Sequence, residues 1–78
     1  MGPFAIGKSY RVLQTFAALR DSFSAGEVMT YHSEAWSRYD GITGYFFQQA
    51  GQERLRVWDI DDDADVSIWR ELFEEVPE

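Results

Sequence analysis

Turn-forming residues recur at short intervals along this chain, and the segments between them are rich in aromatic and β-branched residues. This pattern is typical of a small antiparallel β fold. The strongest turn signal is Asp40-Gly41, a pair that favours the positive φ angles of a two-residue hairpin turn. Six Phe, four Tyr and three Trp supply the bulky side chains that a core needs in a chain of 78 residues. We therefore expect one domain over residues 1–78, folded as an antiparallel barrel or rolled sheet.

Alternating side chains predict the strands and the side chains that share a face. In the third strand Tyr45 and Phe47 share one face and Ile42 and Phe46 the other, so we expect both faces to be at least partly covered. In the fourth strand Leu55 and Val57 are the predicted core residues. Between the first two strands, residues 16–25 read as a loop that Phe23 anchors to the core. The predicted strands cover residues 8–15, 27–33, 42–49 and 53–60.

The period of the apolar residues changes near the C-terminus from two to about 3.6. Trp69, Leu72, Phe73 and Val76 then fall on one stripe, which predicts a short amphipathic helix over about residues 66–76. Asp65 or Ser67 can cap its N-terminus, and an acidic loop at residues 59–65 precedes it. We expect this helix to cover the open face or end of the barrel.

The chain contains three short motifs: Gly7-Lys8-Ser9-Tyr10-Arg11-Val12, then Phe23-Ser24-Ala25-Gly26-Glu27, and Asp40-Gly41 leading to Tyr45-Phe46-Phe47. Together these motifs resemble a family of short uncharacterised bacterial proteins. The resemblance implies a small SH3-like barrel without an assigned activity. The fold expectation is thus a mostly β chain with one C-terminal α-helix, built as an antiparallel SH3-like barrel of four to five strands. The aromatic signature of peptide-binding SH3 domains is missing, so recognition of proline-rich peptides does not carry over.

The charge is distributed very unevenly along the chain. Nine of the fourteen acidic residues lie between Asp59 and Glu78, where Arg70 is the only Lys or Arg, so this segment carries −8 and the rest +1 of the net −7 charge. Such a field attracts cations and basic surfaces. The cluster Asp59, Asp61, Asp62, Asp63 and Asp65 is therefore a candidate surface for a basic protein partner. A DNA-mimicking surface and a merely solvating or helix-capping role are the alternatives.

A calcium loop is another interpretation of the same aspartates. Asp59, Asp61, Asp63 and Asp65 match positions 1, 3, 5 and 7 of an EF-hand loop. Position 6 is Ala64 where the sharp turn requires Gly, and position 12 is Arg70 where a bidentate Glu is required. The motif is therefore incomplete at two of its required positions.

Trp36 and Tyr39 precede the Asp40-Gly41 turn, where the alternation of the strand fails. Exposed Trp and Tyr are common anchors of binding surfaces, and completion of a small core is the other interpretation. Arg54, Arg56 and Trp58 share one predicted strand face that could stack bases, but the net charge opposes binding to nucleic acid.

The residues suggest a non-enzymatic protein-interaction module. His32 is the only histidine, no motif supplies it with a nucleophilic Ser, and Cys is absent, so the sequence shows no catalytic group. No segment is long and apolar enough to span a membrane. We expect a cytoplasmic protein with no cofactor and no membrane or nucleic-acid partner. Unpaired strand edges would also allow a homo-oligomer.

Overall fold

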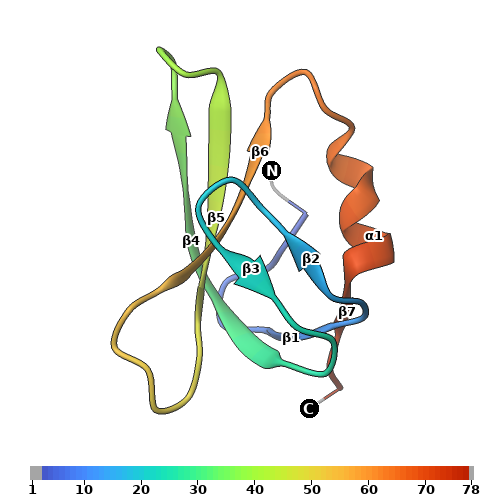
Figure 1. Ribbon diagram of the computed structural model, residues 1–78. Helices are drawn as coiled ribbons and strands as arrows, with labels where there is room; N and C mark the ends of the chain where they lie inside the picture. The colour runs from blue at the N-terminus through green and yellow to red at the C-terminus, as the bar shows by residue number, and fades with distance from the viewer. Residues whose placement is uncertain (1–2, 78) are drawn as a thin grey trace.

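The computed structural model describes residues 3–77 and contains two antiparallel sheets and one short helix near the C-terminus (Figure 1). The larger sheet has five strands, in the order β6 (Arg56–Asp61), β5 (Ile42–Gln48), β4 (Val28–Ser37), β1 (Ser9–Val12) and β7 (Phe73–Glu75). The prediction of a mostly β chain with a helix near its C-terminus is confirmed. Within residues 3–77 the sheet does not close into a barrel, because β6 and β7 are its two edges and do not pair.

The predicted loop at residues 16–25 contains the second sheet. Strands β2 (Phe16–Ala17) and β3 (Ser22–Phe23) form a small hairpin with Phe16 opposite Phe23. The two rings stack with centroids 5.0 Å apart, and Phe23 is buried in the core as expected. The prediction of an irregular loop was wrong, because strands this short leave no periodic signal in the sequence.

Strand β4 runs through the segment that the alternation did not assign. A bulge between Tyr31 and Ser33 shifts the pairing with β5, so the alternation changes phase within one continuous strand. The hairpin loop also differs from the predicted two-residue turn. Ser37 pairs with Ile42, and the loop comprises residues 38–41, closed by a 2.9 Å bond from the Gly41 N–H to the Ser37 carbonyl. Only Gly41 in this loop has a positive φ, of 63°.

The C-terminal helix is shorter than predicted. A 3₁₀ turn, η1 (Val66–Ile68), leads into α1 (Trp69–Leu72), and the chain then becomes the edge strand β7. Phe73 is extended, pairs with Val12 and is buried in the core. The predicted helix over residues 66–76 was therefore wrong beyond Leu72, because pairing with β1 gives Phe73 both a core position and backbone partners. The capping prediction for Asp65 is confirmed by its 3.0 Å bond from the Ser67 N–H.

The core is a cluster of aromatic rings on the face of the sheet that also meets β2, β3 and α1. Phe4, from the segment before β1, has its ring within 5.9 Å of seven other aromatic ring centroids. On β6 the core residue is Trp58, whereas Val57 is buried on the opposite face and Leu55 is only half-buried. Val57 is therefore buried as predicted, although Trp58 rather than Val57 belongs to the aromatic cluster, and the prediction for Leu55 was wrong.

Candidate functional site

The hairpin loop between β4 and β5 meets the acidic loop after β6 at one end of the molecule (Figure 1). The Asp62 N–H donates a 2.7 Å hydrogen bond to the Gly41 carbonyl. The Asp62 carboxylate accepts a 2.6 Å bond from the Trp36 indole N–H and a 3.0 Å bond from the Thr43 hydroxyl. We call the exposed residues gathered here the acidic–aromatic tip: Trp36, Tyr39, Asp61, Asp62 and Asp63.

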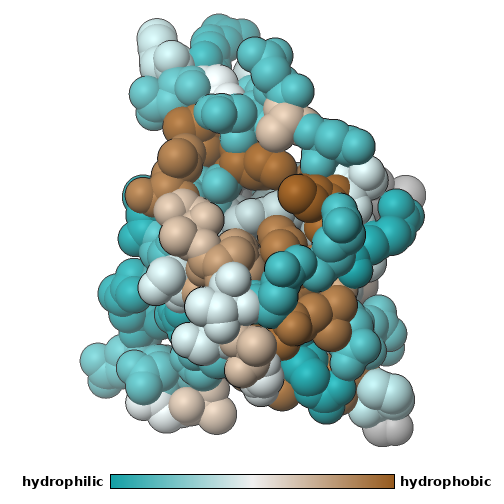
Figure 2. Space-filling model, turned by 45° about the vertical axis from the view of Figure 1, so that its right-hand side comes forward, coloured by the Kyte–Doolittle hydropathy of each residue, from teal (hydrophilic) through white to brown (hydrophobic). Residues whose placement is uncertain are grey.

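The two aromatic side chains of the acidic–aromatic tip are exposed to solvent. Trp36 is 62% exposed and Tyr39 is 96% exposed, so neither completes the core. Asp61, Asp62 and Asp63 are exposed as well, and hydrophilic residues cover most of this upper end of the molecule in Figure 2. The indole of Trp36 is nevertheless held in place by its bond to Asp62. The structure thus brings together five of the seven predicted site residues.

Asp59 has a different role from the one predicted for it. Its side chain is buried, with the residue only 4% exposed, and it binds the β2–β3 loop rather than facing solvent. It accepts hydrogen bonds from the N–H groups of Leu19 (2.7 Å) and Arg20 (3.2 Å), and Arg20 Nε lies 2.5 Å away. Burial raises the pKa of Asp59, but these hydrogen bonds outweigh it and hold the pKa below its usual value. Asp59 is therefore a structural carboxylate, and its inclusion in an exposed binding surface was wrong.

The other predicted site residue outside the acidic–aromatic tip is Asp65. Its carboxylate accepts bonds from the hydroxyl and the N–H of Ser67, and these bonds lower its pKa. The four aspartates of the calcium interpretation thus do not converge. Within residues 3–77 no group of three or more His, Asp or Glu side chains is placed to hold a metal ion. A calcium site would require this loop to rearrange.

The face considered for base stacking is not available as a surface. Arg56 is largely buried and donates to Glu27 at 2.9 Å, and Trp58 belongs to the core. Only Arg54 of the three side chains is mainly exposed, and it pairs with Asp21 at 3.3 Å. The three residues therefore do not form a stacking platform.

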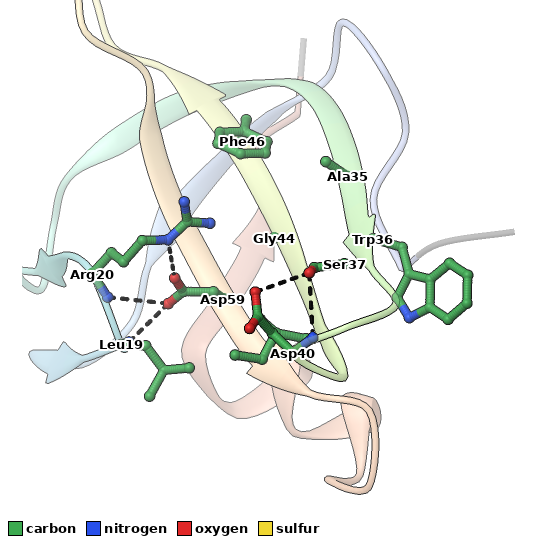
Figure 3. Close-up of a pocket in the computed structure, with 10 residues that line it drawn as sticks. Leu19, Arg20, Ala35, Trp36, Ser37, Asp40, Gly44, Phe46 and Asp59 are labelled. Atoms are coloured by element: carbon green, nitrogen blue, oxygen red, sulfur yellow. Dashed lines mark hydrogen bonds and ion pairs between the residues drawn. The ribbon is translucent and has the colours of Figure 1, made fainter.

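A groove of about 340 Å³ lies on the outer face of the sheet, next to the acidic–aromatic tip (Figure 3). Gly44 lies at its floor, and Leu19 and Arg20 approach from the β2–β3 loop on the side of Asp59. The indole of Trp36 points away from Arg20 and Asp59 in Figure 3. The lining residues are Leu19, Arg20, Ala35, Trp36, Ser37, Asp40, Ile42, Gly44, Phe46 and Asp59.

The sequence interpretation missed this groove. Arg20 reaches Asp59 across 39 positions of the chain, and no local pattern marks that pairing. The one available signal was Gly44, a residue without a side chain inside a strand, which often marks a place where another group approaches the backbone. A Cβ at Gly44 would lie 3.1 Å from Nη2 of Arg20 and 3.2 Å from Cγ2 of Val57, so the groups that approach here are the guanidinium and the Val57 side chain.

None of the helices among residues 3–77 is long and apolar enough to cross a membrane. No protein-family model matches the chain, and no curated protein matches it. Among solved structures, the chain is similar to integron cassette protein VCH_CASS4 from the mobile metagenome of Vibrio cholerae. The identity is 19% and the TM-score 0.77, over 95% of this chain and 87% of that protein. At this identity the comparison shows a shared fold.

Proposed function

We propose that this protein is a non-enzymatic interaction module that binds a basic protein partner through the acidic–aromatic tip. The observation that carries the proposal is the Trp36 indole, which is largely exposed and yet fixed by a hydrogen bond to Asp62. Trp and Tyr are enriched among the residues that dominate binding energy at protein interfaces. An anchor that is already ordered loses little conformational entropy when the partner binds.

The charge of the tip defines the chemistry of the partner. Asp62 binds the Trp36 indole, and Asp61 and Asp63 are its exposed neighbours in the chain. Arg38 is the one base in the adjoining hairpin loop. Complementary charge accelerates encounter and selects against acidic partners. A partner surface with Lys or Arg around an apolar or aromatic contact fits this arrangement.

We also propose that the fold is an SH3-like barrel that stays open. The β2–β3 hairpin contacts both edge strands, since Asp21 accepts a 3.3 Å bond from the Val57 N–H of β6 and Phe23 packs against Phe73 of β7. The hairpin thus protects the edge of β6 without joining it in a backbone ladder, a common way to prevent edge-to-edge association.

The proposal is tested by capture from a lysate of the source organism, with the retained proteins identified by mass spectrometry. Trp36→Ala and the triple variant Asp61→Asn, Asp62→Asn, Asp63→Asn are compared with the unmodified protein. We expect one basic protein to be retained by the unmodified protein, and both variants to reduce its recovery at least about tenfold, the effect of losing one strong anchor.

A matched control removes the same charge elsewhere. Glu53→Gln, Glu71→Gln and Glu75→Gln together change three exposed carboxylates outside the tip. This control should retain the partner as well as the unmodified protein does. Equal loss in the control would mean that only net charge matters, and full retention by Trp36→Ala would contradict the proposal.

A further inference from the structure

The groove beside the tip has a low floor because two of its residues have little or no side chain. Gly44 of β5 and Ala35 of β4 are directly paired, and Phe46 and Ile42 flank Gly44 along β5. The volume of about 340 Å³ is at the lower end of the range for small-ligand pockets. It is sufficient for one large apolar side chain.

The wall formed by Leu19 and Arg20 is held rigidly. Asp59 accepts three hydrogen bonds from these two residues, and the Arg20 guanidinium lies over the Phe46 ring, 5.9 Å from its centroid. Because Asp59 neutralises Arg20, this end of the groove is neutral and largely apolar. A ligand meets a preformed surface here, which lowers the entropic cost of binding.

The end of the groove near the hairpin loop is acidic. Asp40 accepts a 2.9 Å bond from the Ser37 hydroxyl and is otherwise exposed to solvent. Asp61 is the last residue of β6, and Asp62 and Asp63 follow it in the adjoining loop. Arg38 is the one base of the hairpin loop. The groove is therefore polarised, with apolar walls at Leu19, Ala35 and Ile42 and a negative field at the end nearest the acidic–aromatic tip.

We infer that the groove receives an extended segment of the partner protein that carries one large apolar side chain and a Lys or Arg two residues away. In an extended chain, residues i and i+2 point to the same side, so both side chains would face the groove. The apolar side chain packs against Leu19, Ala35 and Ile42, and the basic side chain lies toward Asp40. This inference rests on the proposed function and adds the recognition element for the same partner.

The test is a titration of the full-length ¹⁵N-labelled protein with capped synthetic hexapeptides, followed by two-dimensional NMR. The probe is Ser-Thr-Leu-Thr-Lys-Ser, and the matched peptides carry Ser in place of Leu or Glu in place of Lys. We expect the probe to shift the amide signals of Ala35, Gly44 and Phe46 with a Kd of about 1 mM. The peptide with Ser should bind at least about fivefold more weakly, since it loses the apolar contact. The peptide with Glu should bind about fivefold more weakly, since it loses the attraction to Asp40 and places a like charge there.

Variants of the protein locate the binding. Ala35→Glu places a charged side chain on the groove floor and should abolish the shifts at Gly44 and Phe46. The control Gln48→Glu adds the same charge at an exposed position of β5 outside the groove and should leave these shifts unchanged. If Ala35→Glu fails to fold, Leu19→Ser in the exposed wall replaces it and should weaken binding severalfold.

Equal binding of the three peptides, absence of shifts in the groove, or shifts confined to the acidic–aromatic tip would each overturn this inference. None of these outcomes decides the proposed function, because capture of the partner by the tip is measured separately with the Trp36→Ala variant. If Trp36→Ala abolished capture while the peptides failed to bind the groove, the acidic–aromatic tip would remain the binding surface and the groove would not be part of it.

Discussion

The carboxylate of Asp59 joins the β2–β3 loop to strand β6, and its environment makes stability depend on pH. Three hydrogen bonds hold the pKa of this buried carboxyl below its usual value despite burial. The unfolded chain therefore binds the proton more tightly than the folded chain does. The stabilisation is complete above the pKa of an unfolded aspartate, about 4, and is lost as the pH falls through the lower pKa of the folded state.

We predict that Asp59→Asn lowers the free energy of unfolding by about 2 kcal/mol at pH 7, because an amide replaces a charged acceptor of several bonds. The loss should shrink as the pH falls toward about 2. Urea denaturation at several pH values measures both effects. Asp63→Asn, at an exposed position of the neighbouring loop, is the control and should stay within about 0.5 kcal/mol of the unmodified protein. If the two proteins differed in their free energy of unfolding by the same amount at every pH, the ionisation of Asp59 would not be the source of the stabilisation.

At the scale of elements, Arg56 connects β6 to two separate segments. Its guanidinium donates to Glu27, before β4, at 2.9 Å, and also donates to the Ser22 carbonyl of β3. It lies 4.9 Å from the centroid of the Phe23 ring, and its side chain is only 13% exposed. This one side chain therefore fastens the β2–β3 hairpin onto the edge of the main sheet.

We expect Arg56→Met to lower the free energy of unfolding by about 3 kcal/mol, since it leaves the Glu27 carboxylate without its cation and the buried Asp21 carboxylate with the exposed Arg54 alone. Arg56→Lys should recover less than half of this loss, because an ammonium group cannot reproduce the planar fork of donors. Urea denaturation measures both changes. Arg38→Met, in the exposed hairpin loop, is the control. Full recovery by Lys would mean that charge alone matters at this position.

Local pattern predicted the elements whose buried face repeats regularly. The alternation of Tyr45, Phe46 and Phe47 identified β5, and the expectation that both of its faces are at least partly covered is confirmed, because Tyr45 and Phe47 are buried and Phe46 is half-buried. The helix over residues 66–76 was overextended because Phe73 satisfies a helical stripe and an edge strand equally well, and only its pairing with Val12 separates the two. The second half of β4 was not predicted, because the bulge between Tyr31 and Ser33 changes the phase of the alternation, and only the pairing with β5 shows that the strand continues.

The candidate site was predictable only in its parts. Trp36, Tyr39 and the aspartates of the acidic loop were identified from the sequence, but their meeting depends on bonds between Asp62 and residues of the hairpin, which are 19 or more positions away. Asp59 was grouped with its exposed neighbours because a run of acidic residues carries no sign that one member is buried. Its partner Arg20 comes from a distant loop, so only the tertiary structure reveals the difference.

At the scale of the whole molecule, the open sheet depends on a ring from outside it. Phe4 lies before the first strand, is 7% exposed and contacts aromatic rings from β1, β4, β5, β6, α1 and β7. Five of its seven contacts have centroid separations of 5.4 Å or less with steeply inclined rings, which is favourable geometry for aromatic pairs. The N-terminal segment thus completes the core on which both sheets rest.

We therefore predict that Phe4→Ala lowers the free energy of unfolding by about 3–5 kcal/mol, the usual cost of emptying a buried aromatic position. That is a large part of the roughly 5–15 kcal/mol available to a small domain, so the variant should be partly unfolded at 37 °C. Urea denaturation and near-ultraviolet circular dichroism measure the loss of stability and of aromatic packing. Phe4→Leu should retain most of the packing, and Ile6→Ala, at an exposed neighbouring position, should change little. If Phe4→Ala kept the stability and the aromatic signal of the unmodified protein, the sheet and its two hairpins would form the core without the N-terminal segment.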